Sequence, residues 1–202
     1  TPVPCVPGFD EAAFAAARAP GEPALLAAKR ERAFAAARTL SPPTARDEEW
    51  RRTDPALFPF ENYRRLPALA PRPAGPVDAW DETFDVVVEI TESGFAVTDR
   101  TGTLQREQCF VLPLAEAAAR FPDVISGHLQ GNAQPAAPRL FSQLSGAFWN
   151  VGFLVYVPAN VKIGKGILFR YHLSQAGGAL LPRLLFVAED GAEVSVVEHF
   201  TS

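Results

Sequence analysis

The fold is decided by residues 153–173, FLVYVPANVKIGKGILFRYHL, in which short apolar runs alternate with turn residues. Residues 153–157 predict a strand, residues 158–160 a turn, and residues 161–163 and 167–173 two further strands. The pattern of strand, tight turn and alternating strand returns over residues 184–200, around the turn Glu189-Asp190-Gly191. Short strands that repeat with no helices between them are typical of a solenoid, so residues 151–202 are predicted to begin a parallel β-helix.

The same stretch allows a second interpretation. Val155, Val161, Ile167 and Leu173 lie six residues apart, a spacing that resembles the hexapeptide repeat of left-handed β-helix acyltransferases. Alternating strands produce a six-residue spacing without such a repeat, and here it stops at Gln175. A left-handed β-helix acyltransferase, or another β-helix enzyme, is therefore kept as the alternative. A generic interaction module, the third hypothesis, would show two packed antiparallel sheets.

The remainder of the chain predicts helices and a small mixed region. Asp10 is a good N-cap for a helix that runs to about Arg18, and a longer helix is expected over residues 23–40. Residues 84–90, 95–99 and 108–112 predict strands, and residues 114–121 and 140–148 predict helices. The domain prediction is therefore residues 1–82 for helices and a Pro-rich segment, residues 83–150 for a small α/β region, and residues 151–202 for the β-helix core.

The Pro-rich residues 41–82 carry five aromatic side chains that could form a binding site. They are Trp50, Phe58, Phe60, Tyr63 and Trp80. Large aromatic side chains in such a segment more often anchor it to a neighbouring core, and this is the prediction made here.

The composition limits the kinds of partner that the protein can bind and the cellular compartment that we expect for it. The net charge is -4 and the basic residues form no stripe, which argues against nucleic acid as a partner. No apolar stretch approaches the roughly 20 residues that cross a bilayer, and the chain begins without a signal peptide. The two cysteines are far apart, which indicates a reducing compartment. We therefore expect a cytoplasmic protein that contacts neither membrane nor nucleic acid.

The candidate chemical groups do not converge in the sequence. His128, His172 and His199 are isolated from one another, and the adjacent Glu198 and His199 point to opposite faces of a strand. Cys5 and Cys109 lack a cationic neighbour, and Cys109 reads as a small buried apolar residue. The acidic residues 47–49 read as a solvated start of a helix. The prediction is that the chain is not an enzyme and has no catalytic, cofactor-binding or metal site.

Two stretches carry a family resemblance, residues 41–54 and residues 144–202. Residues 41–54, SPPTARDEEWRRTD, follow a helix and resemble the Pro-Thr and Glu-x-Trp-Arg-x-Thr signature near the N-terminus of SufD. Residues 148–161, FWNVGFLVYVPANV, and residues 182–199, PRLLFVAEDGAEVSVVEH, resemble the beginning of the SufB/SufD core. The chain is therefore similar to the N-terminal portion of the SufB/SufD family of iron–sulfur cluster assembly scaffold proteins, and residues 41–54 favour the SufD branch.

This resemblance implies a fold and partners. The fold would be mixed α+β, an N-terminal helical region followed by the first rungs of a right-handed parallel β-helix. The function would be that of a scaffold in the SUF system, which binds SufB-like and SufC-like proteins. The family's complex handles iron–sulfur clusters and uses ATP through SufC, whereas this portion would bind no cofactor. The natural protein is expected to continue beyond Ser202, and the strand that ends at Phe200 is expected to favour self-association.

Overall fold

A computed structural model describes residues 6–18, 21–130 and 139–202, and the chain divides into two compact units. Unit 1 comprises Thr1–Ala68, Ala118–Val151 and Gly177–Arg183, and unit 2 comprises Leu69–Ala117, Gly152–Ala176 and Leu184–Ser202. The domain boundaries expected from the sequence stay a prediction. Among the described residues, no helix combines the length and the apolar character needed to cross a bilayer.

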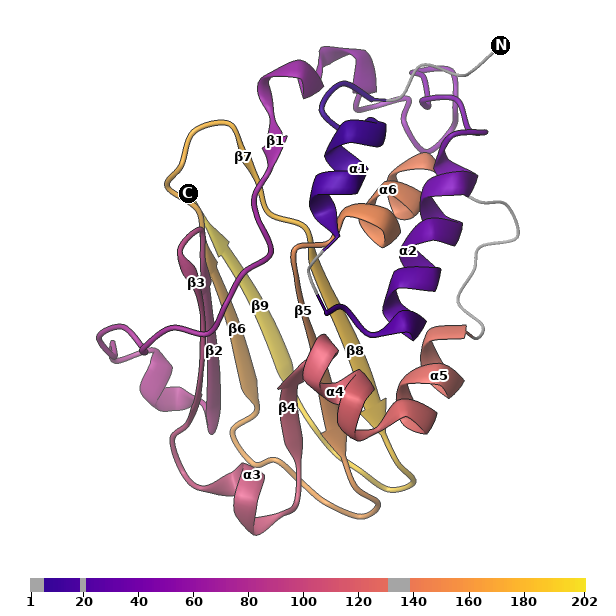
Figure 1. Cartoon of the computed structure of the whole chain (residues 1–202). Helices are drawn as coiled ribbons and strands as arrows, with labels where there is room; N and C mark the ends of the chain where they lie inside the picture. The colour runs from indigo at the N-terminus through magenta and orange to yellow at the C-terminus, as the bar shows by residue number, and fades with distance from the viewer. Residues whose placement is uncertain (1–5, 19–20, 131–138) are drawn as a thin grey trace. The chain divides into compact units, whose positions relative to one another are not determined.

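Unit 1 is built on three packed helices, α1 (Glu11–Ala17), α2 (Ala24–Ala37) and α6 (Leu140–Phe148) (Figure 1). All three were predicted. The Asp10 carboxylate accepts a hydrogen bond from the Ala13 amide at 2.8 Å and so caps α1. The apolar faces of the helices meet in one core, in which the ring of Phe34 lies 4.2 Å from Phe14 and 5.7 Å from Phe148. Burial of these rings is the main stabilisation of the unit.

Shorter elements complete this part of the chain. They are η1 (Pro55–Leu57), η2 (Phe60–Asn62), α5 (Pro122–Gln130), and the two-residue strands β1 (Arg64–Arg65) and β7 (Gly178–Ala179), which pair in parallel. The helix α4 (Leu114–Arg120) contributes residues to both units. The helix α5 was not predicted, although Pro122 at its first position and Asp123 in its first turn are helix-start signals.

The buried Arg30 and the partly buried Arg65 hold the end of α6. Arg30 on α2 donates to the carbonyl oxygens of Ala147 and Trp149 at 2.9 and 2.8 Å, and its guanidinium lies 3.7 Å from the centre of the Trp149 ring. Arg65 donates to the Phe148 and Trp149 carbonyls at 2.7 and 3.1 Å. These carbonyls have no partner within the helix, so the arginines satisfy them and complement the negative end of the helix dipole.

Burial changes the pKa values of these two arginines. Burial, together with the neighbouring charge of Arg30, lowers the pKa of Arg65 to about 10. Burial also lowers the pKa of Arg30, while its ion pair with Glu22 at 2.7 Å acts in the opposite direction. Both side chains of that pair are more than nine-tenths buried. An ion pair of this kind makes the loss of either partner costly.

Replacing Arg30 with methionine is expected to lower the free energy of unfolding by about 3 kcal/mol, because Glu22 and the Ala147 carbonyl lose their partner and the Trp149 carbonyl keeps only Arg65. Urea denaturation measures this change. The matched control is Arg38→Met, which removes the exposed ion pair between Arg38 and Glu11 and should cost less than about 1 kcal/mol. Equal losses in the two variants would contradict the role given to Arg30.

Unit 2 contains two sheets. The four-stranded sheet has the order β3 (Gly94–Asp99), β2 (Val86–Thr91), β6 (Ile167–His172) and β9 (Val196–Thr201). The other sheet has the order β4 (Phe110–Pro113), β5 (Val151–Val157) and β8 (Pro182–Ala188). Phe153 of β5 lies 5.0 Å from Phe95 and 5.8 Å from Phe169, so the two sheets pack face to face through aromatic rings. The short helix α3 (Thr103–Arg106) joins β3 to β4.

The predicted right-handed parallel β-helix is wrong. Over the residues that the structure describes, the strands form three separate small sheets, and none of them closes or coils into a solenoid. Parallel pairs do occur, and β6 pairs with β9 so that Ile167 lies opposite Val196. The other neighbour of β6 is β2, and β2 pairs antiparallel with β3. Because the sheets are mixed, the structure is neither a β-helix, left- or right-handed, nor a pair of antiparallel sheets.

The physical reason for this error is that alternation specifies two faces of a strand but not its neighbours. Residues 161–163, predicted as a strand, make only an isolated bridge between Lys162 and Glu193. The strands at 153–157 and 167–173, predicted as one continuous repeat, belong to different sheets. The segment 86–91 takes the position beside β6 that a preceding rung would have occupied.

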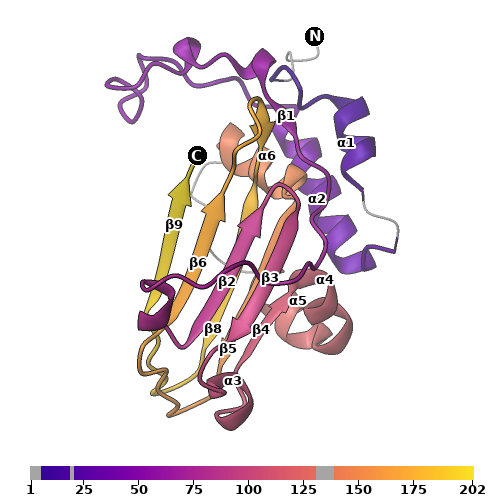
Figure 2. The same ribbon diagram turned by 90° about the vertical axis from the view of Figure 1, so that its left-hand side faces the viewer.

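A charged network lies on the outer face of the four-stranded sheet. Residues 69–83 cross this face (Figure 2), and a Cβ atom on Gly94 would collide with the Ala70 carbonyl oxygen. The crossing segment ends in η3 (Asp81–Thr83). Arg170 of β6 contacts Asp78 and the buried Asp81, each at 2.9 Å, and Glu89 of β2 at 3.1 Å. One guanidinium thus joins the crossing segment to two strands.

Glu89 should make the stability of unit 2 sensitive to acid. Burial alone would raise the pKa of Glu89, but the Gly75 amide, Arg72 and Arg170 together hold that pKa below its usual value. A carboxyl group with a depressed pKa in the folded state contributes stability above its unfolded pKa of about 4.3, and this contribution is lost as the pH falls through the folded value. Urea midpoints are expected to drop below about pH 4.

The Arg170→Met variant should show a smaller drop between neutral pH and pH values below about 4, because the pKa of Glu89 then moves back toward its unfolded value. The measurement is the urea midpoint of both proteins across that range. The assignment to this network would fail if wild type and variant lost the same stability over it.

Candidate functional site

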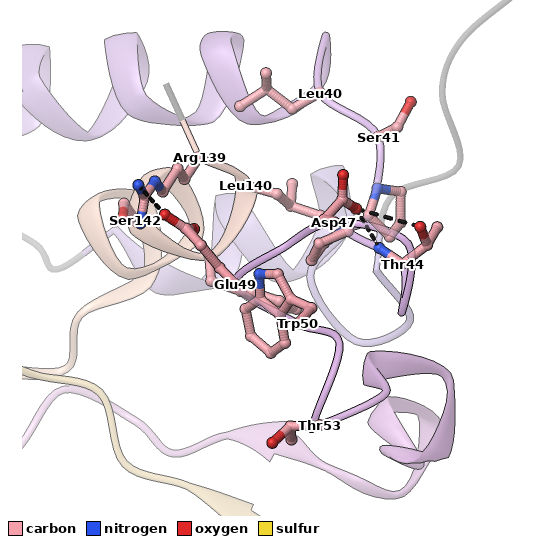
Figure 3. A pocket seen from close by; sticks show the side chains of 13 residues that line it. Leu40, Ser41, Thr44, Asp47, Glu49, Trp50, Thr53, Arg139, Leu140 and Ser142 are labelled. Carbon is pink, nitrogen blue, oxygen red and sulfur yellow. Dashed lines mark hydrogen bonds and ion pairs between the residues drawn. The ribbon is translucent and has the colours of Figure 1, made fainter. Parts of the chain in front are cut away.

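A cavity lies in unit 1, between the segment that follows α2 and the first turn of α6. Its volume is about 870 Å³. It is lined by Leu40, Ser41, Pro42, Pro43, Thr44, Asp47, Glu49, Trp50, Thr53, Arg139, Leu140, Phe141 and Ser142 (Figure 3). Nine of these thirteen residues fall within residues 40–53, so the stretch with the family signature forms most of the wall.

Short-range hydrogen bonds fix this wall. Pro42 and Pro43 cannot continue α2, and the chain turns away from it. The Asp47 carboxylate then accepts hydrogen bonds from the amide of Thr44 at 2.7 Å and from its hydroxyl at 3.2 Å. Further turns follow, in which the Trp50 amide donates to the Asp47 carbonyl at 2.8 Å. The acidic residues 47–49 are exposed as predicted, but they lie in turns and begin no helix.

Aromatic packing sets the position of Trp50. Its ring lies 5.2 Å from Phe141 of α6, and Phe141 in turn stacks on Phe60 at 5.5 Å. The anchoring role predicted for Trp50 and Phe60 is therefore confirmed. Phe58 contacts Phe60 and Tyr63 at 5.2 and 5.9 Å, yet 56% of its surface stays exposed, and the adjacent Leu57 is 82% exposed. An apolar surface thus continues outward from the aromatic side of the cavity.

The rim of the cavity is polar. Arg139 and Glu49 form an ion pair at 2.5 Å beside the amino-terminal end of α6, which has no side-chain cap (Figure 3). Both side chains are more than half exposed, so the pair adds little stability. The Glu49 carboxylate complements the positive end of the helix dipole. An apolar interior with a charged rim is the arrangement found where one protein buries a side chain of another.

The histidines and the Glu198–His199 pair lie elsewhere. His128 is in α5, and His172 contacts the Thr201 hydroxyl at 2.9 Å. Tyr171 donates to Glu198 at 3.0 Å, whereas His199 contacts the Trp80 ring at 4.8 Å, so the adjacent Glu198 and His199 do point to opposite faces. Within the described ranges, no three His, Cys, Asp or Glu side chains are grouped so that they could hold a metal ion.

The remaining candidates are the two cysteines and the turn at residues 189–191. Cys109 is buried as predicted, and burial, with the charge of Glu107, raises the pKa of its thiol. Cys5 lies outside the described residues. Residues 189–191 form the predicted turn, where Gly191 has a φ of 72°. Glu189 accepts a hydrogen bond from Tyr156 at 2.5 Å, which raises the pKa of that hydroxyl.

The sequence analysis singled out the residues that form one wall of the cavity, but it gave no sign of which residues form the other wall. Residues 41–54 were singled out for their resemblance, and no cavity was predicted from them. The contribution of Arg139, Leu140, Phe141 and Ser142 comes from a segment about ninety residues away, as the ion pair of Arg139 with Glu49 shows. The helical spacing of Leu140 and Leu144 signalled a buried face of α6, and nothing in that spacing identified what the first turn would meet.

A mixed α/β protein with a cavity lined by aromatic and polar side chains is the class that this fold and site define. Comparison of the sequence with known families then gives the particular family. The SufBD protein N-terminal region matches residues 15–168, a range that includes the cavity and most of both units. The chain belongs to the SufBD family.

Several curated relatives agree with this assignment. An iron–sulfur cluster assembly SufBD family protein of Pyrococcus horikoshii is 26% identical over 118 residues, which cover 54% of this chain and 26% of that protein. A protein of the same description from Synechocystis is 29% identical over 89 residues, 44% of this chain and 18% of its own length. One from Staphylococcus saprophyticus is 34% identical over 68 residues, 34% of this chain and 15% of its own.

The hydrogen bonds of Asp47 predict a graded effect of substitution. Asp47→Ala should lower the free energy of unfolding by about 1 kcal/mol, because the Thr44 amide and hydroxyl lose their acceptor. Asp47→Asn keeps an acceptor oxygen at the same position and should cost only a few tenths of that. Thermal unfolding of both variants measures the difference. Equal losses in the two variants would show that the carboxylate does not hold this wall by hydrogen bonding.

Proposed function

We propose that this chain forms part of a scaffold subunit in iron–sulfur cluster assembly, and that the subunit works by binding other proteins. The observation that carries the proposal is the family match over residues 15–168, together with relatives named for iron–sulfur cluster assembly. The partners are homologues of SufB and SufC in a cytoplasmic SUF system. Residues 41–54 favour the SufD branch.

In this proposal the chain has no catalytic residues and holds no cofactor. Iron–sulfur clusters are the cargo of the complex, and ATP is used by the SufC homologue. Support for a binding role comes from the cavity, which combines the aromatic side chains of Trp50 and Phe141 with a charged rim. Tryptophan in a cavity that a partner covers is a frequent source of binding energy.

The full-length protein that contains this chain is expected to co-purify with a SufB homologue and a SufC homologue when the three are expressed together. Size-exclusion chromatography and quantification of each subunit measure the complex. A full-length protein that bound neither homologue would overturn the proposal.

A second experiment tests whether the cavity takes part. Trp50→Ala in the full-length protein should weaken binding to the SufB homologue about tenfold or more, because an anchoring side chain loses its site. Trp80→Ala is the matched control, since Trp80 lies in unit 2 and contacts Phe84 and His199. Circular dichroism verifies that both variants are folded. Unchanged binding by a folded Trp50→Ala variant would remove the cavity from the interface.

A further inference from the structure

Three cationic side chains, Lys29, Arg32 and Arg183, gather in unit 1 where α2 packs on α6 (Figure 1). Lys29 and Arg32 are three residues apart on α2 and so occupy neighbouring positions on the helix surface. Arg183, near the start of β8, reaches the same place. A Cβ atom added to Gly146 of α6 would lie 3.8 Å from the Nη1 atom of Arg183 and 3.1 Å from the Cβ atom of Ala33. We call these three cations the basic cluster.

The basic cluster has no carboxylate partner among the described residues. Glu31, the one acidic residue of α2, pairs with Arg18 at 3.3 Å, and Glu22 pairs with Arg30. Those of residues 1–202 that fall outside the described ranges contain no aspartate or glutamate. The charge of the basic cluster is therefore not neutralised within this part of the protein.

This lack of a partner is unfavourable, because two of the three cations are partly buried. Burial lowers the pKa of Lys29, and the charges of Arg183 and Arg32 lower it further. Burial also lowers the pKa of Arg183, and the neighbouring charge of Arg30 acts in the same direction. A cation that loses water without gaining an opposite charge is destabilised. Arg30 and Arg170, by contrast, each contact a carboxylate.

We propose that the basic cluster binds the carboxylate of an aspartate or glutamate side chain from outside residues 1–202, in the full-length subunit or in a protein bound to it. The Arg183 guanidinium and the Lys29 ammonium group donate to the carboxylate oxygens, and Arg32 adds positive charge on the exposed side. Hydrogen bonds between such charged groups are stronger than those between neutral groups.

The position of the basic cluster favours a side-chain carboxylate over a phosphate ligand. Lys29 and Arg32 lie in the middle of α2, away from the helix N-terminus at which phosphate groups are commonly bound. The site is also distinct from the cavity, which lies at the opposite end of α6. It goes beyond the proposed function and does not require the subunit to bind SufB or SufC homologues.

Carbodiimide cross-linking of the full-length protein tests the site, because this reagent joins an amine directly to a carboxylate that pairs with it. Two samples are compared: the full-length protein alone, and the same protein purified from its own cells with the proteins bound to it. Peptide mass spectrometry should find Lys29 joined to an aspartate or glutamate outside residues 1–202. Lys162, which pairs with Glu193 at 2.6 Å, is the internal control for the reagent.

The two samples distinguish the sources of the carboxylate. A cross-link in the protein alone assigns the carboxylate to the same polypeptide, and a cross-link found only in the second sample assigns it to a bound protein. The proposal would be overturned if Lys162 and Glu193 were joined in both samples while Lys29 was joined to nothing, or only to acids within residues 1–202. Failure of the proposed function would appear instead as absence of the SufB and SufC homologues from the second sample.

Arg183→Met tests whether the guanidinium holds the carboxylate. The yield of the Lys29 cross-link, relative to that between Lys162 and Glu193, should fall about tenfold. Arg38→Met is the matched control, since Arg38 is exposed on the same helix and pairs with Glu11, and it should leave the relative yield unchanged. Circular dichroism verifies folding, and the wild-type cross-link decides the proposal by itself if Arg183→Met does not fold. An unchanged relative yield in a folded Arg183→Met variant would overturn the proposal.

Discussion

The carboxy-terminal end of α6 is the constraint on which unit 1 depends. The carbonyls of its last turn have no helical partners and lie in a buried environment, where an unpaired carbonyl is costly. Arg30 from α2 and Arg65 from β1 supply the missing donors. The packing of α2 on α6 and the position of β1 are therefore set by the same few hydrogen bonds. Hydrophobic burial supplies most of the stability, and these bonds select the arrangement in which it is obtained.

Asn150, two residues after the end of α6, likewise provides hydrogen-bond partners for backbone groups. Its side-chain amide donates to the Leu66 and Ala179 carbonyls at 3.2 and 3.0 Å, and its oxygen accepts from the Leu181 amide at 2.9 Å. A buried amide with all these partners ties β1 and β7 to the end of the helix. In unit 2 the Arg170 network does comparable work, because one guanidinium satisfies carboxylates from a strand and from the crossing segment. Both units thus use buried charge to fix positions that apolar contacts alone leave open.

The surface features differ in kind between the two units. In unit 1 a cavity is closed by turns on one side and by a helix on the other, so its shape depends on local hydrogen bonds of Asp47 and on the ring of Phe141. In unit 2 the outer face of the four-stranded sheet instead carries the ion pairs of Arg170 with Asp81 and Glu89. The SufBD family match over residues 15–168 includes every residue that lines the cavity.

The sequence by itself determined the helices α1, α2 and α6 and the strands of unit 2, because caps, prolines and apolar periodicity act over a few residues. It also identified the family, since the signature at residues 41–54 is a local string. On α2 the buried Leu26, Arg30 and Phe34 lie four residues apart, and this spacing carries no signal for the partners of Arg30.

Only the tertiary structure decided which strands pair with one another and which segments meet at the cavity. Alternation cannot distinguish a solenoid from open mixed sheets, because both bury one face of every strand, and the pairing of β6 with β2 joins segments about eighty residues apart. The cavity likewise needed Phe141 and Arg139 to meet residues 40–53 across a long separation in sequence. Such contacts depend on how all the elements of the unit pack together. No single stretch of sequence therefore predicts them.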